Sequence, residues 1–161
     1  MSWIYVFDFL TEIAFLLLVF TLALCFAIFV GRQAIMNLIF GLYLALLISI
    51  EFPYYDTIFK GLTSDHTQAG AKLGFFLFIT TLTTTLCYRV MPSEFREKRF
   101  ESIPKKAILA LAATILVMIF SFNVLPVTEF LTPSTPIQSL FAPEAYYFWW
   151  LLAPLVVLYF V

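Results

Sequence analysis

The feature that most constrains this chain is a series of five apolar runs, each close to the length of a helix that crosses a bilayer. The first run covers residues 13–30 and contains no charged residue. The others lie at about 34–50, 70–90, 107–124 and 145–161. A helix needs about 20 apolar residues to cross a hydrocarbon core roughly 30 Å thick. The runs therefore predict an integral membrane protein that crosses the bilayer several times.

The composition excludes the main alternatives. Residues of the AVILMFWYC class make up 63% of the 161 residues, and charged residues make up only 12%, against about 25% in a soluble domain. A soluble fold of this size has too little interior for so much apolar surface. A disordered chain would be richer in charge, and the net charge of -1 argues against binding to nucleic acid.

The spans are expected to be helices, because backbone amides in lipid must be satisfied within their own segment. A β-barrel needs strands that alternate polar and apolar residues, whereas residues 15–20 read FLLLVF. We therefore predict an all-α, polytopic transmembrane helical bundle, a single domain over residues 1–161 with four full spans and a fifth. The fifth run, 145–161, is short and contains Pro154, so partial insertion is its alternative.

Lysine and arginine counts predict the orientation, since these residues favour cytoplasmic loops. With five spans, one side of the membrane holds Arg32 and the segment Arg89–Lys106. That side carries seven of the nine basic residues, namely Arg32, Arg89, Arg96, Lys98, Arg99, Lys105 and Lys106. The N-terminus and the proline-rich loop 125–144 are then expected outside.

Small and polar residues recur at helical spacing in two of the runs. In the second run, Asn37, Gly41, Ala45 and Ser49 fall on one helix face. In the third, Gly70 and Gly74 have GxxxG spacing. Small residues let helix backbones approach closely in membranes. We predict that both sets form helix-packing seams, with a polar pore wall as the alternative for the second run.

Threonines crowd the third run. Thr80 and Thr84 form one row, and Thr81 and Thr85 form the next. Each hydroxyl can bond to a carbonyl one turn earlier in its own helix. The alternative is a hydroxyl-lined path for water or ions, although such a path usually also needs a charge within the membrane.

Charged residues are expected at the membrane surfaces. Arg96, Lys98, Arg99, Lys105 and Lys106 are candidates for contact with anionic lipid or a cytoplasmic partner. Asp8 and Glu12 are expected to form an anionic rim at the outer interface, or to lie one turn into it if the first helix starts early.

No catalytic or metal-binding pattern stands out. His66 is the only histidine and follows Asp65 in a polar stretch, while Cys25 and Cys87 lie inside apolar runs without further ligands. We expect no enzyme activity, no catalytic residues, no metal and no cofactor.

The order of parts resembles the bacterial colicin V production protein family of small inner-membrane proteins. The resemblance lies in the Gly31-Arg32 joint between the first two runs, the small residues of Gly41-Leu42-Tyr43-Leu44-Ala45, and a basic connector before the fourth run. The joint lacks a second glycine and further basic residues. The resemblance implies a place in the bacterial inner membrane and a role in export or envelope homeostasis.

Taken together, these patterns predict a non-enzymatic membrane protein that acts through helix packing and partner binding in export, envelope maintenance or complex assembly. The partners expected are the lipid bilayer and either a second copy of the chain or another membrane subunit, with no nucleic acid. The alternative is a channel or transporter subunit whose threonine-rich third helix lines a passage.

The predicted orientation can be tested by cysteine labelling. In a variant without Cys25 and Cys87, a cysteine introduced by Ser93→Cys lies in the predicted cytoplasmic connector, because the basic residues cluster there. An impermeant thiol reagent should label it only after the membrane is opened. Labelling from outside in intact cells would show that the predicted orientation is wrong.

Overall fold

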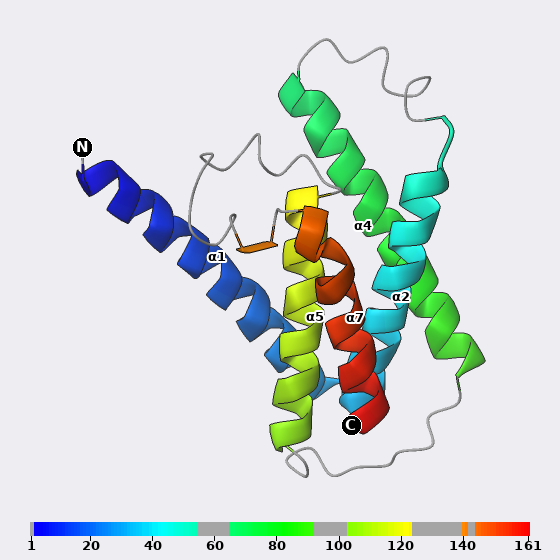
Figure 1. The fold of residues 1–161 in the computed structure, drawn as a ribbon. Coiled ribbons are helices and arrows are strands. Elements are labelled where there is room, and N and C mark those ends of the chain that lie inside the picture. The colour runs from blue at the N-terminus through cyan, green and yellow to red at the C-terminus, as the bar shows by residue number, and fades with distance from the viewer. Residues whose placement is uncertain (1, 55–64, 92–102, 124–139, 142–143) are drawn as a thin grey trace.

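The computed structural model describes residues 2–54, 65–91, 103–123, 140–141 and 144–161. These residues form no strand, and five helices run alternately up and down a bundle (Figure 1). The helices are α1 (Ser2–Phe29), α2 (Arg32–Glu51), α4 (Asp65–Val90), α5 (Ile103–Asn123) and α7 (Glu144–Phe160). Helices α1, α2, α4 and α5 are long and apolar enough to cross a membrane, and the apolar part of α7, Tyr146–Phe160, is shorter. The predicted all-α transmembrane bundle is confirmed.

The helices extend beyond the apolar runs that predicted them. Helix α1 begins at Ser2 rather than at residue 13, and α5 begins at Ile103, so the last residues of the expected connector 91–106 are helical. Apolar side chains mark the part of a helix that suits lipid, whereas the helix itself continues until the backbone is interrupted. Residues 2–12 contain no glycine or proline, and Pro104 in the first turn of α5 suits a helix start.

One glycine makes the turn between α1 and α2. Gly31 has a φ of 113° and immediately precedes the first residue of α2. Residues with a Cβ atom rarely adopt a positive φ of this size, whereas glycine adopts it at little cost. The chain therefore reverses within a residue or two, and α1 and α2 meet at one end of the bundle (Figure 1).

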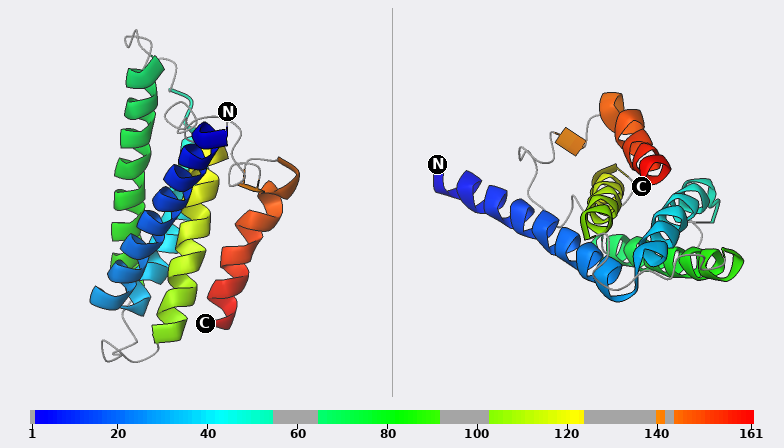
Figure 2. Two further views of the ribbon diagram at one scale, coloured as in Figure 1. Left: turned by 90° about the vertical axis from the view of Figure 1, so that its left-hand side faces the viewer. Right: turned by 90° about the horizontal axis from the view of Figure 1, so that it is seen from below.

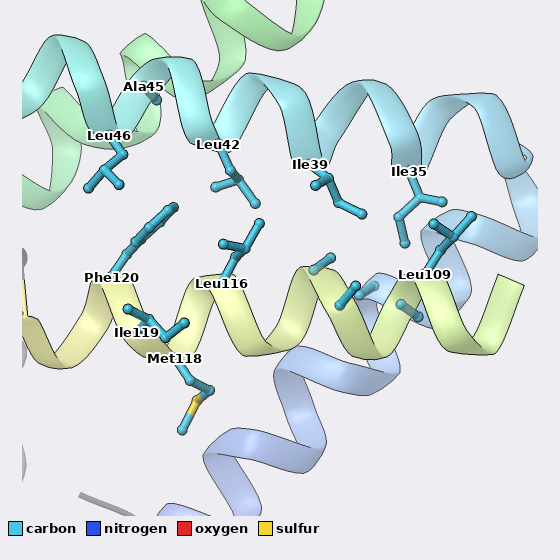
Figure 3. Packing of buried hydrophobic residues seen from close by; sticks show 14 of the residues in the cluster. Ile35, Ile39, Leu42, Ala45, Leu46, Leu109, Leu116, Met118, Ile119 and Phe120 are labelled. Atoms are coloured by element: carbon cyan, nitrogen blue, oxygen red, sulfur yellow. The ribbon is translucent and has the colours of Figure 1, made fainter. Parts of the chain in front are cut away.

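Helix α5 occupies the centre of the hydrophobic core. Ile35, Ile39, Leu42 and Leu46 of α2 point toward Leu109, Leu116 and Phe120 of α5 (Figure 3). On α5, Ala110, Ala112 and Ala113 are also buried, and so are Ala23 and Ala27 of α1. Because α1 and α5 are in contact, these alanines let the two helices approach closely.

The second half of α1 contributes more side chains to the described core than the first half does. Ala23 and Ala27 lie in the core, whereas the N-terminal half leans away from α5 (Figures 1 and 2). In the most apolar 18-residue stretch of α1, just 11% of the residues are buried, compared with 56% in the corresponding stretch of α5. Most of this helix is therefore left for lipid or for another protein.

Two long-range hydrogen bonds attach α7 to α2. Pro154 lies inside α7 and is buried, and it has no amide hydrogen to donate to the carbonyl one turn earlier. Close to this weak point, the Tyr43 hydroxyl donates to the carbonyl of Leu151. Arg32 Nη2 donates to the main-chain oxygen of Val161. Neighbouring side chains of this kind make proline tolerable in a membrane helix.

The bond from Tyr43 predicts a measurable loss of stability. Tyr43→Phe removes the hydroxyl that serves Leu151 and should lower the free energy of unfolding by about 1 kcal/mol. The measurement is thermal unfolding in a mild detergent. Tyr159→Phe is the control, because Tyr159 is 85% exposed and its hydroxyl should not matter. Equal melting temperatures for wild type and Tyr43→Phe would contradict the role of this bond.

Candidate functional site: the α2–α4 interface

The predicted seam of the second run lies on a buried face of α2. Asn37 and Ala45 are fully buried, Ser49 is 5% exposed, and Gly41 is buried between them. Ile35 and Ile39 occupy a different face and point to α5 (Figure 3). Since α2 and α4 are in contact, the seam is where the second and third spans meet.

Gly41 is a point of very close approach between α2 and α4. A Cβ atom added there would lie 2.9 Å from both the Cα and the backbone nitrogen of Thr84, and it would overlap the Thr84 hydroxyl oxygen. Backbone atoms cannot move aside as a flexible side chain can. The absence of a side chain at Gly41 therefore lets α2 and α4 touch backbone to backbone.

A threonine next to this contact joins the two helices. Thr83 Oγ1 lies 2.8 Å from the carbonyl oxygen of Gly41 and 2.8 Å from that of Ile79 in its own helix. A third carbonyl, that of Thr80, lies 3.1 Å away. One hydroxyl hydrogen is shared among these acceptors. Thr83 is 3% exposed, and its place in the interface was not predicted, because it belongs to neither threonine row.

Other polar groups at this interface are buried without partners. Four buried atoms have no hydrogen-bond partner among the described residues: Asn37 Nδ2, Ser49 Oγ, Thr80 Oγ1 and Thr84 Oγ1. Asn37 does accept a bond at Oδ1 from Gln33 Nε2, at 3.2 Å. Leaving a buried donor or acceptor unsatisfied costs about 1–3 kcal/mol. The interface therefore combines close packing with unused hydrogen-bonding capacity.

The two predicted threonine rows separate onto different surfaces of α4. Thr80 and Thr84 carry the buried hydroxyl oxygens just described. Thr81 and Thr85 are exposed, and they donate to the carbonyls of Leu77 at 2.8 Å and Thr81 at 2.7 Å. Because the rows do not share a surface, the four threonines do not line one path.

Gly70 and Gly74 differ from the prediction. Both are exposed, and a Cβ atom added at either would meet nothing within 4 Å. They therefore do not pack against another described helix of this chain. At 100° per residue, Gly70 and Gly74 fall on the same side of α4 as Thr81 and Thr85. We call these four residues, together with Leu77, the outer face of α4.

The basic residues also depart from expectation. Lys105 is exposed in the first turn of α5, but Lys106 is only 1% exposed. A side chain so buried is not available to lipid head groups or to a partner, so its assignment to a contact surface is wrong. The helix begins at Ile103 and turns Lys106 inward. Arg96, Lys98 and Arg99 lie outside the described residues.

Glu12 was expected at an exposed interface and is instead buried. It is 2% exposed, and neither carboxylate oxygen has a hydrogen-bond partner among the described residues. It lies inside the candidate span Phe9–Phe29. The apolar run that began at residue 13 left this residue just outside the predicted span, whereas the longer helix places it inside.

The described residues contain no group of three or more His, Cys, Asp or Glu side chains that could hold a metal ion. Cys25 is exposed and Cys87 is buried, and both are free. Asp65 and His66 lie in the first turn of α4. The α2–α4 interface itself offers close backbone contact, hydroxyls and amides, which suits packing and hydrogen bonding.

Comparison with known proteins finds no matching family model, no matching curated protein and no matching solved structure. The functional argument therefore depends on the geometry of this chain.

The two glycine environments predict opposite effects of the same substitution. Gly41→Ala places a methyl group against the Thr84 backbone and should destabilise the protein by about 1–3 kcal/mol, as overpacking does. Gly74→Ala meets open space and should be neutral or stabilising by up to about 1 kcal/mol, because alanine favours helix. Unfolding in detergent measures both. A Gly41→Ala protein as stable as Gly74→Ala would show that α2 and α4 are not in close contact.

Proposed function

We propose that this chain is a non-enzymatic integral membrane protein that acts through helix packing and partner binding, in export, envelope maintenance or assembly of a larger complex. We place it in a bacterial inner membrane with its N-terminus outside, following the charge distribution and the resemblance to the colicin V production proteins. Its partners are the lipid bilayer and either a second copy of itself or another membrane subunit.

The outer face of α4 is the observation that carries this proposal. Gly70 and Gly74 are exposed at GxxxG spacing with open space around both. Glycine is less favourable than alanine in a helix interior by about 1 kcal/mol, and close packing of another helix is what usually offsets that cost in membranes. Within the described residues no helix covers this face, so a helix from another chain is the natural occupant.

The first helix supports the same reading. Large apolar side chains of α1 are exposed between Phe9 and Phe29, including Leu10, Leu18 and Leu22. Its N-terminal half leans away from the rest of the bundle (Figure 2). This exposed apolar surface offers a partner helix a place to pack.

The experiment tests assembly through the outer face of α4. Gly74→Leu adds bulk where a partner helix is expected. Because an added Cβ meets nothing within 4 Å and leucine favours helix over glycine, the monomer's melting temperature should stay the same or rise slightly. Wild-type protein extracted gently from its native membranes should migrate as a complex larger than one chain. Gly74→Leu should release it as a monomer.

A matched control separates loss of a contact from a general effect of bulk. Leu47 is 61% exposed on α2, which carries neither proposed partner surface, so Leu47→Trp adds bulk on another helix and should leave a complex held by α4 intact. A Gly74→Leu protein that assembles like wild type, or a wild-type protein that is monomeric in its native membranes, would contradict the proposal.

The channel alternative draws on the unpaired polar atoms between α2 and α4. Against it, the contact of Gly41 with Thr84 leaves no opening at the middle of that row, and Thr81 and Thr85 lie outside the interface. Valine in place of both Thr80 and Thr84 keeps the side-chain shape and removes two hydroxyls that have no hydrogen-bond partner among the described residues. The double variant should be at least as stable as wild type. Expressed in a deletion strain, it should restore the wild-type phenotype.

Ion flux into proteoliposomes distinguishes the two readings. A packing interface predicts no flux for either protein, because an apolar or closed contact does not conduct. Flux through wild-type protein that the double variant abolishes would replace the scaffold with a channel.

A further inference from the structure

An apolar groove runs along one side of α7 near its start. Its volume is about 380 Å³, and its lining residues are Leu140, Tyr146, Trp149, Trp150 and Ala153. The four residues from α7 follow one another at i, i+3, i+4 and i+7, so they form one stripe on the helix. Leu140, from the short segment before α7, forms the opposite wall. Pockets of this size with mainly apolar and aromatic linings commonly bind small molecules.

The wall opposite α7 is fixed in position. Trp150 Nε1 donates to the carbonyl of Leu140 at 3.0 Å, and the rings of Phe141 and Trp150 lie 4.9 Å apart. Phe141 is 6% exposed and belongs to the hydrophobic core. These contacts form the groove before any ligand arrives, which lowers the ordering cost of binding.

The other side of α7 is already occupied. Pro154 is buried, and Tyr43 and Arg32 hold the helix by their bonds to Leu151 and Val161. The groove faces outward instead, with Tyr146 58% and Trp149 65% exposed. Helix α7 stands at the edge of the bundle beside α5 (Figure 2). In a membrane protein, what meets such a surface is lipid.

The chemistry of the lining fits one part of a lipid in particular. The indole N–H of Trp150 is used by Leu140, so Trp150 offers the groove only apolar surface. Tyr146 and Trp149 each carry a hydrogen-bond donor near the start of α7, where tyrosine and tryptophan typically meet the phosphate and ester groups of lipids. An apolar chain with an acceptor-rich head matches this arrangement.

We propose that this groove binds one acyl chain of a membrane phospholipid, whose head group accepts hydrogen bonds from Tyr146 and Trp149. The driving force is contact rather than dehydration, because lipid tails are as apolar as the groove. Two walls surround the chain with more atoms at van der Waals distance than a convex helix surface does. The bound lipid should therefore stay with the protein while ordinary surrounding lipid exchanges. This inference does not depend on the proposed function.

The experiment uses the full chain purified in a mild detergent. A phospholipid with a diazirine in the middle of one acyl chain is added and activated by light, and the adducts are mapped by peptide mass spectrometry. Native mass spectrometry of the same sample counts retained lipid. We expect one retained phospholipid per chain and adducts concentrated at Leu140, Trp149 and Ala153.

Three variants make the result specific. Ala153→Trp fills the groove and Leu140→Ala removes its outer wall, so both should lose the retained lipid and the concentrated adducts. Leu155→Trp is the control, because Leu155 is 42% exposed on the other flank of α7, and it should retain the lipid. Since Leu140→Ala adds no bulk, it decides the matter if Ala153→Trp does not fold. The proposal would be overturned if Leu140→Ala retained as much lipid as wild type. It would also be overturned if the adducts were spread evenly over α1 and α7, because surrounding lipid alone would produce that pattern.

Discussion

Close contact between helix backbones is what this bundle depends on. Inside a bilayer, an apolar side chain gains little by leaving lipid for protein, because both surroundings are hydrocarbon. Helices then associate through van der Waals contact and interhelical hydrogen bonds. Gly41 provides both, since Thr84 lies against its backbone and Thr83 Oγ1 lies 2.8 Å from its carbonyl. The buried alanines of α1 and α5 allow the same kind of approach on the other side of the core.

Polar groups in the bundle divide into those that hold helices together and those that are left unused. Thr83 links α4 to α2, and Tyr43 links α2 to α7 beside Pro154. Asn37 and Glu12, by contrast, bury polar atoms that have no partner within the described residues. Such groups weaken a membrane protein unless something else satisfies them.

The sequence predicted the class of fold because lipid allows so few backbone solutions. Five apolar runs led directly to five helices. The same reasoning placed Gly41 and Ala45 on a single face, and that face is buried. It could not tell that Gly70 and Gly74, with a stronger pairing signature, are not covered by any other described helix. Spacing identifies residues that share a face, whereas what covers that face depends on how helices cross.

The sequence also failed to predict that two charged residues are buried. Lys106 and Glu12 both sit next to an apolar run, where sequence reasoning assigned them to surfaces. Helix ends, rather than charge, decide such positions: α5 starts at Ile103 and α1 continues back to Ser2. Pro104 was a signal that could have moved the start of α5. The bond from Tyr43 to Leu151 joins residues far apart in the chain, so no local sequence pattern predicts it.

The contact between Gly41 and Thr84 is tested most directly by a double-mutant cycle. Gly41→Ala, Thr84→Ala and the double variant are unfolded in lipid nanodiscs. The overlap of a new Cβ with the Thr84 hydroxyl predicts that Thr84→Ala recovers part of the stability lost in Gly41→Ala. The coupling expected for residues in direct contact is about 0.5–3 kcal/mol. Strictly additive effects would mean that the two positions do not touch, and close packing of α2 against α4 would no longer explain how this bundle is held together.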